Sequence, residues 1–356
     1  MGFVIGRTDN GTQRPTGHLG EYRALDGSAG ATLSLDLDTP HAMLVVGKRG
    51  YGKSYTLGVI AEELARATGV APVVIDPMGV FETLADTAAE EPVPADVVRR
   101  PTVPPNALDP KSWCSLLDLT PESGPGSLLW QATQKRETIA AMQAEIAETN
   151  APERAIRSAR NHLDLADSWG IFDANGLDVA TLTSGGVTVL DVSGLDTAPM
   201  NAVCRGVAQL LYRARVADAT DRLPWLLVDE AHAFFDGGAE SALELLLTRG
   251  RAPGVSLVTA TQRPSAIPAV GISQSDILVS HRLTAADDLA ALETVQPTYL
   301  DGEFTDKLPT EPGAVLVVDD ATETVHAARI RSRATPHGGE SPRASELAAD
   351  AQLIEE

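Results

Sequence analysis

A cluster of small and polar residues at 47–54, with the sequence GKRGYGKS, could hold phosphate. It matches the pattern G-x-x-x-x-G-K-[ST], follows an apolar run and precedes a helical pattern, which is the setting that this motif needs. Glycines let successive backbone N–H groups turn inward around phosphate oxygens, and the following helix N-terminus adds positive dipole. We expect Lys53 to reach the β- and γ-phosphates and Ser54 to bind Mg²⁺. An ordinary glycine turn is the alternative, and the flanking strand and helix argue against it.

This motif is a P-loop, and it makes ATP and Mg²⁺ the expected cofactors. The residues expected to bind the nucleotide are Gly47, Arg49, Gly50, Tyr51, Gly52, Lys53, Ser54 and Tyr55. The other expectations about the site depend on this one.

Two adjacent carboxylates, Asp229 and Glu230, follow an apolar run at 226–228. Ligands bind at the carboxyl ends of strands in open α/β sheets, so these side chains are expected beside the P-loop. We expect Asp229 to hold Mg²⁺ through water, and Glu230 to act as the general base that polarises the attacking water. A solvated helix start is the alternative, and the P-loop in the same chain favours the catalytic interpretation.

A further apolar run, at 255–260, precedes polar residues that include Gln262. An amide at a strand end can hydrogen-bond both the γ-phosphate and the lytic water, so Gln262 is a candidate sensor; a polar turn residue is the alternative. Arg249 and Arg251 precede this run, and Arg282 is a weaker candidate of the same kind. An arginine from a neighbouring subunit can raise the rate by about 10³- to 10⁵-fold, which would imply a ring. A solvated arginine pair is the alternative.

These groups need elements that bring them to one edge, and the chain alternates short apolar runs with amphipathic segments. Such alternation predicts a parallel sheet covered on both faces, hence an α/β fold. The expected strands are 42–46, 72–76, 187–191, 225–228, 255–260 and 277–280, with a closing hairpin at 314–318 and 324–330. The expected helices are 54–67, a helix around 203–211, and one near 239–247, with a polar helical insertion at about 127–169. Residues 11–30 and the proline-rich stretch 90–110 are expected to be loops.

The chain has 356 residues, 43% of them hydrophobic, which is enough for one large core or two modest domains. No run of about 18 apolar residues occurs, and the N-terminus becomes polar too soon for a secretory signal, so we expect a cytoplasmic protein. The formal net charge is −21, whereas nucleic-acid-binding proteins are usually basic. We expect the acidity to be an adaptation to a salt-rich, halophilic cytoplasm, since salt screens charge within about 3 Å at 1 M.

The cysteines and histidines give little sign of a metal site. Cys114 and Cys204 cannot alone form a disulfide framework or a zinc site, and Cys204 lies in an apolar helical pattern typical of a small core residue. We interpret His41 and His232 as structural or loop residues, and His281 gives no clear signal.

Taken together, the P-loop, the DEAH stretch at 229–232 and the TQRPS stretch at 261–265 resemble the HerA/FtsK superfamily, with the HerA branch the closer match. The stretches LDLD at 35–38 and RSRATPHGG at 331–339 are HerA-like too. The resemblance spans about 5–339, and TQRPS after a strand is more specific than the generic P-loop.

The resemblance implies a RecA-like P-loop NTPase core that acts as a DNA translocase, in a homohexameric ring that moves double-stranded DNA through its pore. It implies the roles given above for the P-loop, the two carboxylates and Gln262, and it makes Arg251 the finger in trans. HerA members work with a NurA-type nuclease in DNA-end resection, so the resemblance implies a role in DNA repair or end processing. HerA proteins usually begin with a small β-barrel, whereas only about forty residues precede the P-loop strand here, so we interpret them as a reduced barrel.

The expected organisation has five segments. They are 1–40, the N-terminal barrel remnant; 41–110, the P-loop half of the core; 111–183, the helical insertion; 184–332, the Walker B and sensor half; and 333–356, a flexible acidic tail.

Other functions remain open for a chain with these motifs. A viral or plasmid DNA-packaging or DNA-transfer ATPase of the same superfamily would carry the same residues. An ATP-dependent assembly switch would bind ATP with little turnover, and Glu230 and Gln262 argue against it because a pure switch needs no placed base. A P-loop kinase is disfavoured, since these strand ends suit water rather than an acceptor substrate.

Overall fold

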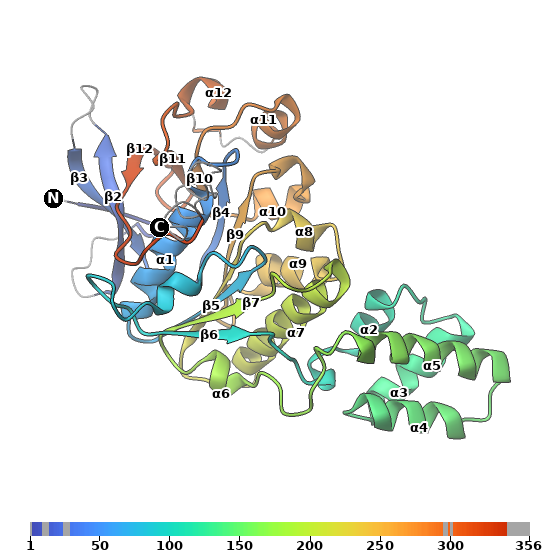
Figure 1. The fold of residues 1–356 in the computed structure, drawn as a ribbon. Coiled ribbons are helices and arrows are strands. Elements are labelled where there is room, and N and C mark those ends of the chain that lie inside the picture. Colours follow the sequence, from blue (N-terminus) through green and yellow to red (C-terminus); the bar gives the residue numbers. More distant parts are fainter. Residues whose placement is uncertain (1, 9–13, 24–28, 295–297, 300–301, 340–356) are drawn as a thin grey trace, which may run out of the picture.

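The computed structural model describes residues 2–8, 14–23, 29–294, 298–299 and 302–339, and the strands in them form a single sheet (Figure 1). The parallel strands, in spatial order, are β10 (Ile277–Ser280), β4 (Ala42–Val46), β9 (Ser256–Thr261), β8 (Leu223–Val228), β5 (Val70–Asp76), β7 (Val187–Asp191) and β6 (Ala95–Arg99). Beyond β10 come β11 (Ala314–Asp319), β12 (Thr324–Ile330), β2 (Thr16–Arg23), β3 (Ala29–Asp36) and β1 (Phe3–Ile5), mostly antiparallel. The predicted α/β class with a mainly parallel sheet is confirmed.

Both faces of the sheet are covered, which is why its central strands are continuous apolar runs. In β4, Leu44 and Val46 belong to one buried cluster, while Met43 and Val45 belong to the other. The helices over the first face are α7 (Thr197–Val216), α8 (His232–Phe235), α9 (Glu240–Arg249), α10 (Ala269–Ser273) and α11 (Ala286–Glu293), and those over the second are α1 (Lys53–Arg66) and η1 (Glu82–Ala85). The shorter elements are η2 (Pro105–Ala107), α6 (Val179–Leu182), η3 (Pro264–Ala266) and α12 (Phe304–Lys307).

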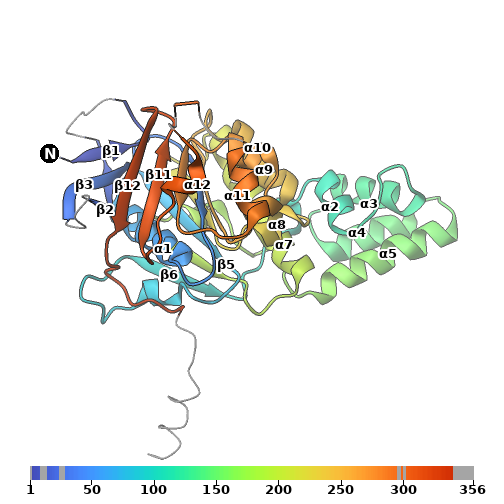
Figure 2. The ribbon, with the colours of Figure 1, turned by 90° about the horizontal axis from the view of Figure 1, so that it is seen from above.

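A group of four helices stands apart from the sheet, beyond α7, in both Figure 1 and Figure 2. They are α2 (Pro110–Leu116), α3 (Gly124–Lys135), α4 (Ile139–Glu148) and α5 (Glu153–Ser168). Their apolar faces bury a separate core that includes Trp113, Leu129 and Met142. Side chains cap the starts of α2 to α4, as when Asp109 accepts a hydrogen bond from the Ser112 amide at 2.7 Å. The predicted helical insertion is therefore present.

Two strands lie where the sequence predicted loops. β2 lies within the predicted loop 11–30. The sequence did not indicate this strand because its glycines interrupt the apolar alternation. One of these glycines is needed for packing, since a Cβ on Gly20 would lie 2.0 Å from the Arg329 carbonyl oxygen of β12. Glycine inside a strand often marks a bulge or a close backbone approach, and the β2–β3 register does shift between His18 and Gly20. β6 lies within the predicted loop 90–110. The sequence did not indicate it because it is a short, half-exposed edge strand that begins directly after Pro94.

Both ends of the described chain pack against the core. The first strands extend the main sheet through β12, so they form part of the same layer as the core. Residues 333–339, the start of the predicted flexible tail, pack against α1, where Thr335 is 3% exposed; residues 340–356 lie outside the described residues. The division into five segments stays a prediction.

Cys204 is fully buried in α7, as expected of a core residue. No helix in the described part of the chain is long and apolar enough to cross a membrane.

Candidate nucleotide-binding site

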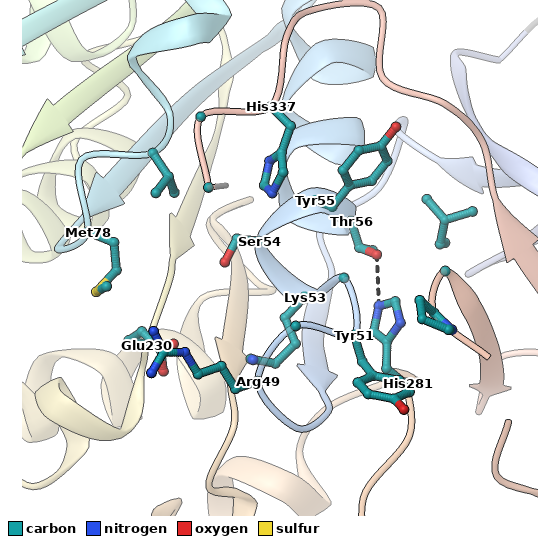
Figure 3. Close-up of a pocket in the computed structure, with 18 residues that line it drawn as sticks. Arg49, Tyr51, Lys53, Ser54, Tyr55, Thr56, Met78, Glu230, His281 and His337 are labelled. Carbon is teal, nitrogen blue, oxygen red and sulfur yellow. Dashed lines mark hydrogen bonds between the residues drawn. The ribbon is translucent and has the colours of Figure 1, made fainter. Parts of the chain in front are cut away.

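A pocket of about 710 Å³ opens where the P-loop joins β4 to α1 (Figure 3). The lining residues are Arg49, Gly50, Tyr51, Gly52, Lys53, Ser54, Tyr55, Thr56, Met78, Val80, Glu230, His281, Pro312, Gly313, Ile330, His337, Gly338 and Gly339. The site therefore joins the P-loop with the turn after β5, the end of β8, the end of β10, the β11–β12 hairpin and the segment after β12. Gly47, Asp229, Gln262 and Arg251 are not among the lining residues.

The P-loop backbone has a conformation that requires glycine. Gly50 and Gly52 have φ angles of 79° and 110°, a region that L side chains rarely adopt. Gly52 accepts the first helical hydrogen bond from the Thr56 amide at 2.8 Å, so α1 starts immediately after it. The first N–H groups of a helix lack partners within the helix and favour an anion in front of them. Lys53 is only 5% exposed, and this burial lowers the pKa of its ammonium group although Glu230 and Asp229 oppose the shift.

The two predicted Mg²⁺ ligands meet although 174 residues separate them in the chain. Ser54 Oγ donates a hydrogen bond to Asp229 Oδ2 at 2.7 Å. Asp229 is fully buried at the end of β8, and burial, with the neighbouring Glu230 charge, raises its pKa to about 6. A hydroxyl and a carboxylate are hard oxygen donors of the kind that Mg²⁺ prefers. Among the described residues no group of three His, Cys, Asp or Glu side chains could hold a metal.

Glu230 projects into the pocket from a strained position. Its φ angle of 45° is uncommon for a residue with a side chain, and such strain clusters at functional sites. Its Oε2 atom is buried, has no hydrogen-bond donor among the described residues, and lies 3.4 Å from His232 Nδ1. Burial raises the pKa of this carboxyl group, although Lys53 and Arg49 oppose the shift. A carboxylate with a raised pKa, facing the same pocket as the P-loop, can accept a proton from water.

His281 is a site residue that the sequence did not reveal. It is fully buried beneath the P-loop, and its Nε2 lies 2.9 Å from Thr56 Oγ1 (Figure 3). A Cβ on Gly47 would lie 2.6 Å from the Cβ of His281, so the histidine supports the loop from below. Burial and the Lys53 charge lower the pKa of His281 to about 4, which keeps the ring neutral. A single histidine after a strand has no spacing pattern that could have identified it.

Gln262 and Arg251 lie at opposite ends of β9. Gln262 follows the carboxyl end of β9, half-buried, and β9 lies between the P-loop strand β4 and the carboxylate strand β8. Arg251 is exposed before the amino end of β9, where it lines a separate pocket of about 260 Å³ with Asp276. β9 runs parallel to β4, so its carboxyl end lies at the edge of the sheet that carries the P-loop. Six residues of strand span about 20 Å, and Arg251 lies beyond the other end of β9, so it is about 20 Å from that edge. Arg251 therefore cannot reach the pocket of its own subunit.

His41 has structural partners. Its ring is 1% exposed and lies between two carboxylates, with Nδ1 2.9 Å from Asp276 Oδ2 and Nε2 3.5 Å from Asp36 Oδ2. Burial lowers its pKa, but hydrogen bonds and charge from Asp276 and Asp36 outweigh burial and raise the pKa to about 9. This arrangement links the N-terminal strands to β10.

Comparison with known proteins places this geometry in context. Residues 18–209, more than half of the chain, match the family described as "Helicase HerA, central domain". The structure of VirB4 of Thermoanaerobacter pseudethanolicus is similar, with 18% identity, a TM-score of 0.68, and coverage of 92% of this chain and 98% of that one. The plasmid coupling protein TrwB, bound to the non-hydrolysable GTP analogue GDPNP, shares 16% identity with a TM-score of 0.51, over 84% of this chain and 87% of that one. The search of curated proteins finds no significant match. The likeness to these structures shows the predicted RecA-like P-loop ATPase fold.

Proposed function

Because the chain belongs to the HerA central-domain family, within the HerA/FtsK superfamily of P-loop ATPases, we propose that it is an ATP-hydrolysing motor of HerA type that moves double-stranded DNA. One observation carries the proposal: Glu230 and the P-loop lysine line the same pocket, next to the 2.7 Å contact between Ser54 and Asp229. A triphosphate held by the P-loop would have its terminal phosphate between a cation and the half-buried carboxylate of Glu230, which is the arrangement that hydrolysis requires.

Each side chain has a defined part in this proposal. Lys53 binds the β- and γ-phosphates, and Ser54 and Asp229 hold Mg²⁺, which neutralises charge on the phosphate oxygens. Glu230 takes a proton from the attacking water, and Gln262, at the adjacent strand end, senses the γ-phosphate. The raised pKa of Glu230 and its unsatisfied Oε2 atom support the role of base.

The position of Arg251 supports a ring. Arg251 and the P-loop lie at opposite edges of one sheet, so Arg251 could complete a site only in another subunit. A contact that joins one edge of a subunit to the opposite edge of its neighbour is heterologous, and such contacts form a ring when the rotation between subunits closes. We propose a homohexamer in which Arg251 is the finger in trans.

The cellular setting of this motor also belongs to the proposal. We place it in the cytoplasm of a halophile, because a net charge of −21 suits a salt-rich solvent. DNA repair or end processing is the role we propose, with a NurA-type nuclease as the candidate partner. The strands β1 to β3 stand for the reduced N-terminal barrel in this interpretation.

DNA transfer is the second candidate function, and the likeness to TrwB favours it. TrwB is described as a plasmid coupling protein and as a bacterial conjugative coupling protein, and its TM-scores with this chain are 0.51 and 0.52. DNA packaging by an ATPase of the same superfamily stays a further alternative. An assembly switch with little turnover is the alternative of a different class.

The test is the rate of phosphate release with and without duplex DNA, in molar KCl. We expect DNA to stimulate the wild-type rate, and the Glu230→Gln protein to bind ATP and release no phosphate at any DNA concentration. Slow release that DNA does not change would support the switch instead. Normal hydrolysis by Glu230→Gln would remove Glu230 from the mechanism.

A further inference from the structure

A segment after β12, residues 331–339, crosses α1 beside the pocket, and we call it the C-terminal strap (Figure 3). Its anchor is Glu62, a fully buried carboxylate of α1. Glu62 accepts hydrogen bonds from the amides of Ala334 and Thr335 at 3.1 and 2.9 Å, and from Thr335 Oγ1 at 2.7 Å. These bonds hold the pKa of Glu62 below its usual range, although burial opposes them.

Two arginines of the strap complete the anchor. Arg331 lies 2.8 Å from Glu62 and 2.7 Å from Glu63, and the side chain of Arg333 is 2% exposed with its Nε 3.5 Å from Glu62. The Arg333 guanidinium fits only because residue 58 of α1 is glycine: a Cβ on Gly58 would lie 2.8 Å from Arg333 Cζ. Buried charges are costly unless they are paired, so this arrangement fixes the course of the strap.

The fixed course brings the end of the strap into the pocket. His337, Gly338 and Gly339 line it, and a Cβ on Gly338 would lie 2.8 Å from the carbonyl oxygen of Val80, another lining residue. The strap therefore spans from β12 to the turn after β5. The ring of His337 packs edge-on against that of Tyr55, with centroids 5.3 Å apart and an angle of 69° between the rings.

The rings lie away from the carboxylate that would serve hydrolysis. Figure 3 shows Ser54 and Lys53 between Glu230 on one side and His337 with Tyr55 on the other. If the triphosphate lies along the P-loop with its γ-phosphate toward Glu230, the nucleoside end of ATP points toward the rings. Aromatic rings stack on nucleobases, which all have a π-face.

We propose that His337, held by Tyr55 and the Glu62-anchored strap, stacks on the base of the bound nucleotide. The strap is then a nucleoside subsite built by the C-terminal segment. The proposal rests on the proposed function only in that the P-loop holds the triphosphate. Glycine at 338 lets the strap pass close to the Val80 carbonyl oxygen, and glycine at 339 lets the backbone approach the His337 ring, so both positions help to fix the ring at the pocket wall.

Calorimetric titration with two ligands separates base from phosphate binding: AMPPNP, a non-hydrolysable ATP analogue, and inorganic tripolyphosphate, each with Mg²⁺. We expect His337→Ala to weaken AMPPNP binding about tenfold, within the range for one base–ring stack, and to leave tripolyphosphate unchanged. His337→Phe should keep AMPPNP affinity, since phenylalanine retains a stacking face. Ser332→Ala is the matched control, because this exposed strap residue does not line the pocket.

The outcomes distinguish the subsite from the phosphate site. Unchanged AMPPNP affinity in His337→Ala, or an equal loss for both ligands, would overturn the subsite. Lys53→Ala should weaken both ligands, which tests the proposed function separately. If Lys53→Ala changes neither ligand while His337→Ala still weakens AMPPNP selectively, the P-loop assignment fails and the subsite stands.

Discussion

Two inactive variants, Arg251→Ala and Lys53→Ala, are expected to restore one another's ATPase activity when their subunits assemble together. Arg251→Ala subunits keep an intact P-loop but lack the finger, and Lys53→Ala subunits supply the finger but cannot use their own pocket. The basis is the distance of about 20 Å between Arg251 and the P-loop edge of its own sheet, so Arg251 can complete a pocket only in a neighbouring subunit.

The size of the effect follows from counting sites. In an equal mixture, half of the pockets belong to subunits with Lys53, and half of their neighbours carry Arg251, so about a quarter of all sites are complete. An arginine finger contributes about 10³- to 10⁵-fold to the rate, so each variant alone has a negligible background. The mixture should therefore reach up to about a quarter of the wild-type rate if sites act independently.

Phosphate release, measured after joint assembly at several subunit ratios, provides the assay. The rate should peak near equal amounts and fall toward both ends. Arg249→Ala is the matched control, because it is the other member of the arginine pair and should stay active alone. No restoration at any ratio, or full activity of Arg251→Ala alone, would refute the reasoning.

Three further predictions concern the pocket, the buried His41 before β4, and the C-terminal strap. Lys53→Ala should abolish ATP binding or hydrolysis, whereas Glu230→Gln should retain ATP without turnover, as measured by nucleotide binding and phosphate release. Because the folded pKa of His41 is about 9 and its ordinary value is 6.5, the protonated ring stabilises the fold below pH 6.5, and this stabilisation is lost as the pH rises through 9. The loss is about 3 kcal/mol in the free energy of unfolding by denaturant, and a His41→Gln protein should lack this pH dependence. Glu62→Gln should lower that free energy by about 3 kcal/mol, since it leaves the buried Arg333 without its carboxylate partner, and the Ser332→Ala control should change it little.

How well the sequence predicted each element depended on how much of it is buried. The strands β4, β7 and β10 have the predicted bounds, because a strand covered on both faces is a continuous apolar run with clear ends. β2 and β6 were missed because one contains glycines for close approach to β12 and the other is a half-exposed edge. Local patterns do not record which neighbouring strand makes a glycine necessary.

The same limit applies to the site. The P-loop and the Asp229–Glu230 pair were identifiable because their chemistry lies in adjacent residues, and the structure brings both to one pocket edge. His281 and His337 come from separate segments that carry no spacing signal, and only the fold brings them to the P-loop. The stretch at 331–339 indicated a resemblance to HerA proteins but not where the segment lies in the fold. Its contact with α1 depends on Glu62, which looks like any helical surface residue in the sequence although it is buried in the structure.

The sheet itself explains why one subunit would be an incomplete enzyme under the proposed function. The groups that would bind the phosphates and hydrolyse ATP follow the carboxyl ends of parallel strands, while Arg251 lies before the amino end of β9. Under that proposal two halves of a catalytic centre would lie on opposite edges, and no side-chain movement could join them within one chain. Hydrolysis would then depend on contact between subunits. DNA held between them could control the rate by changing the distance between Arg251 of one subunit and the P-loop edge of the next. A monomeric form that hydrolysed ATP at the full rate would show that this division of the centre has no functional consequence.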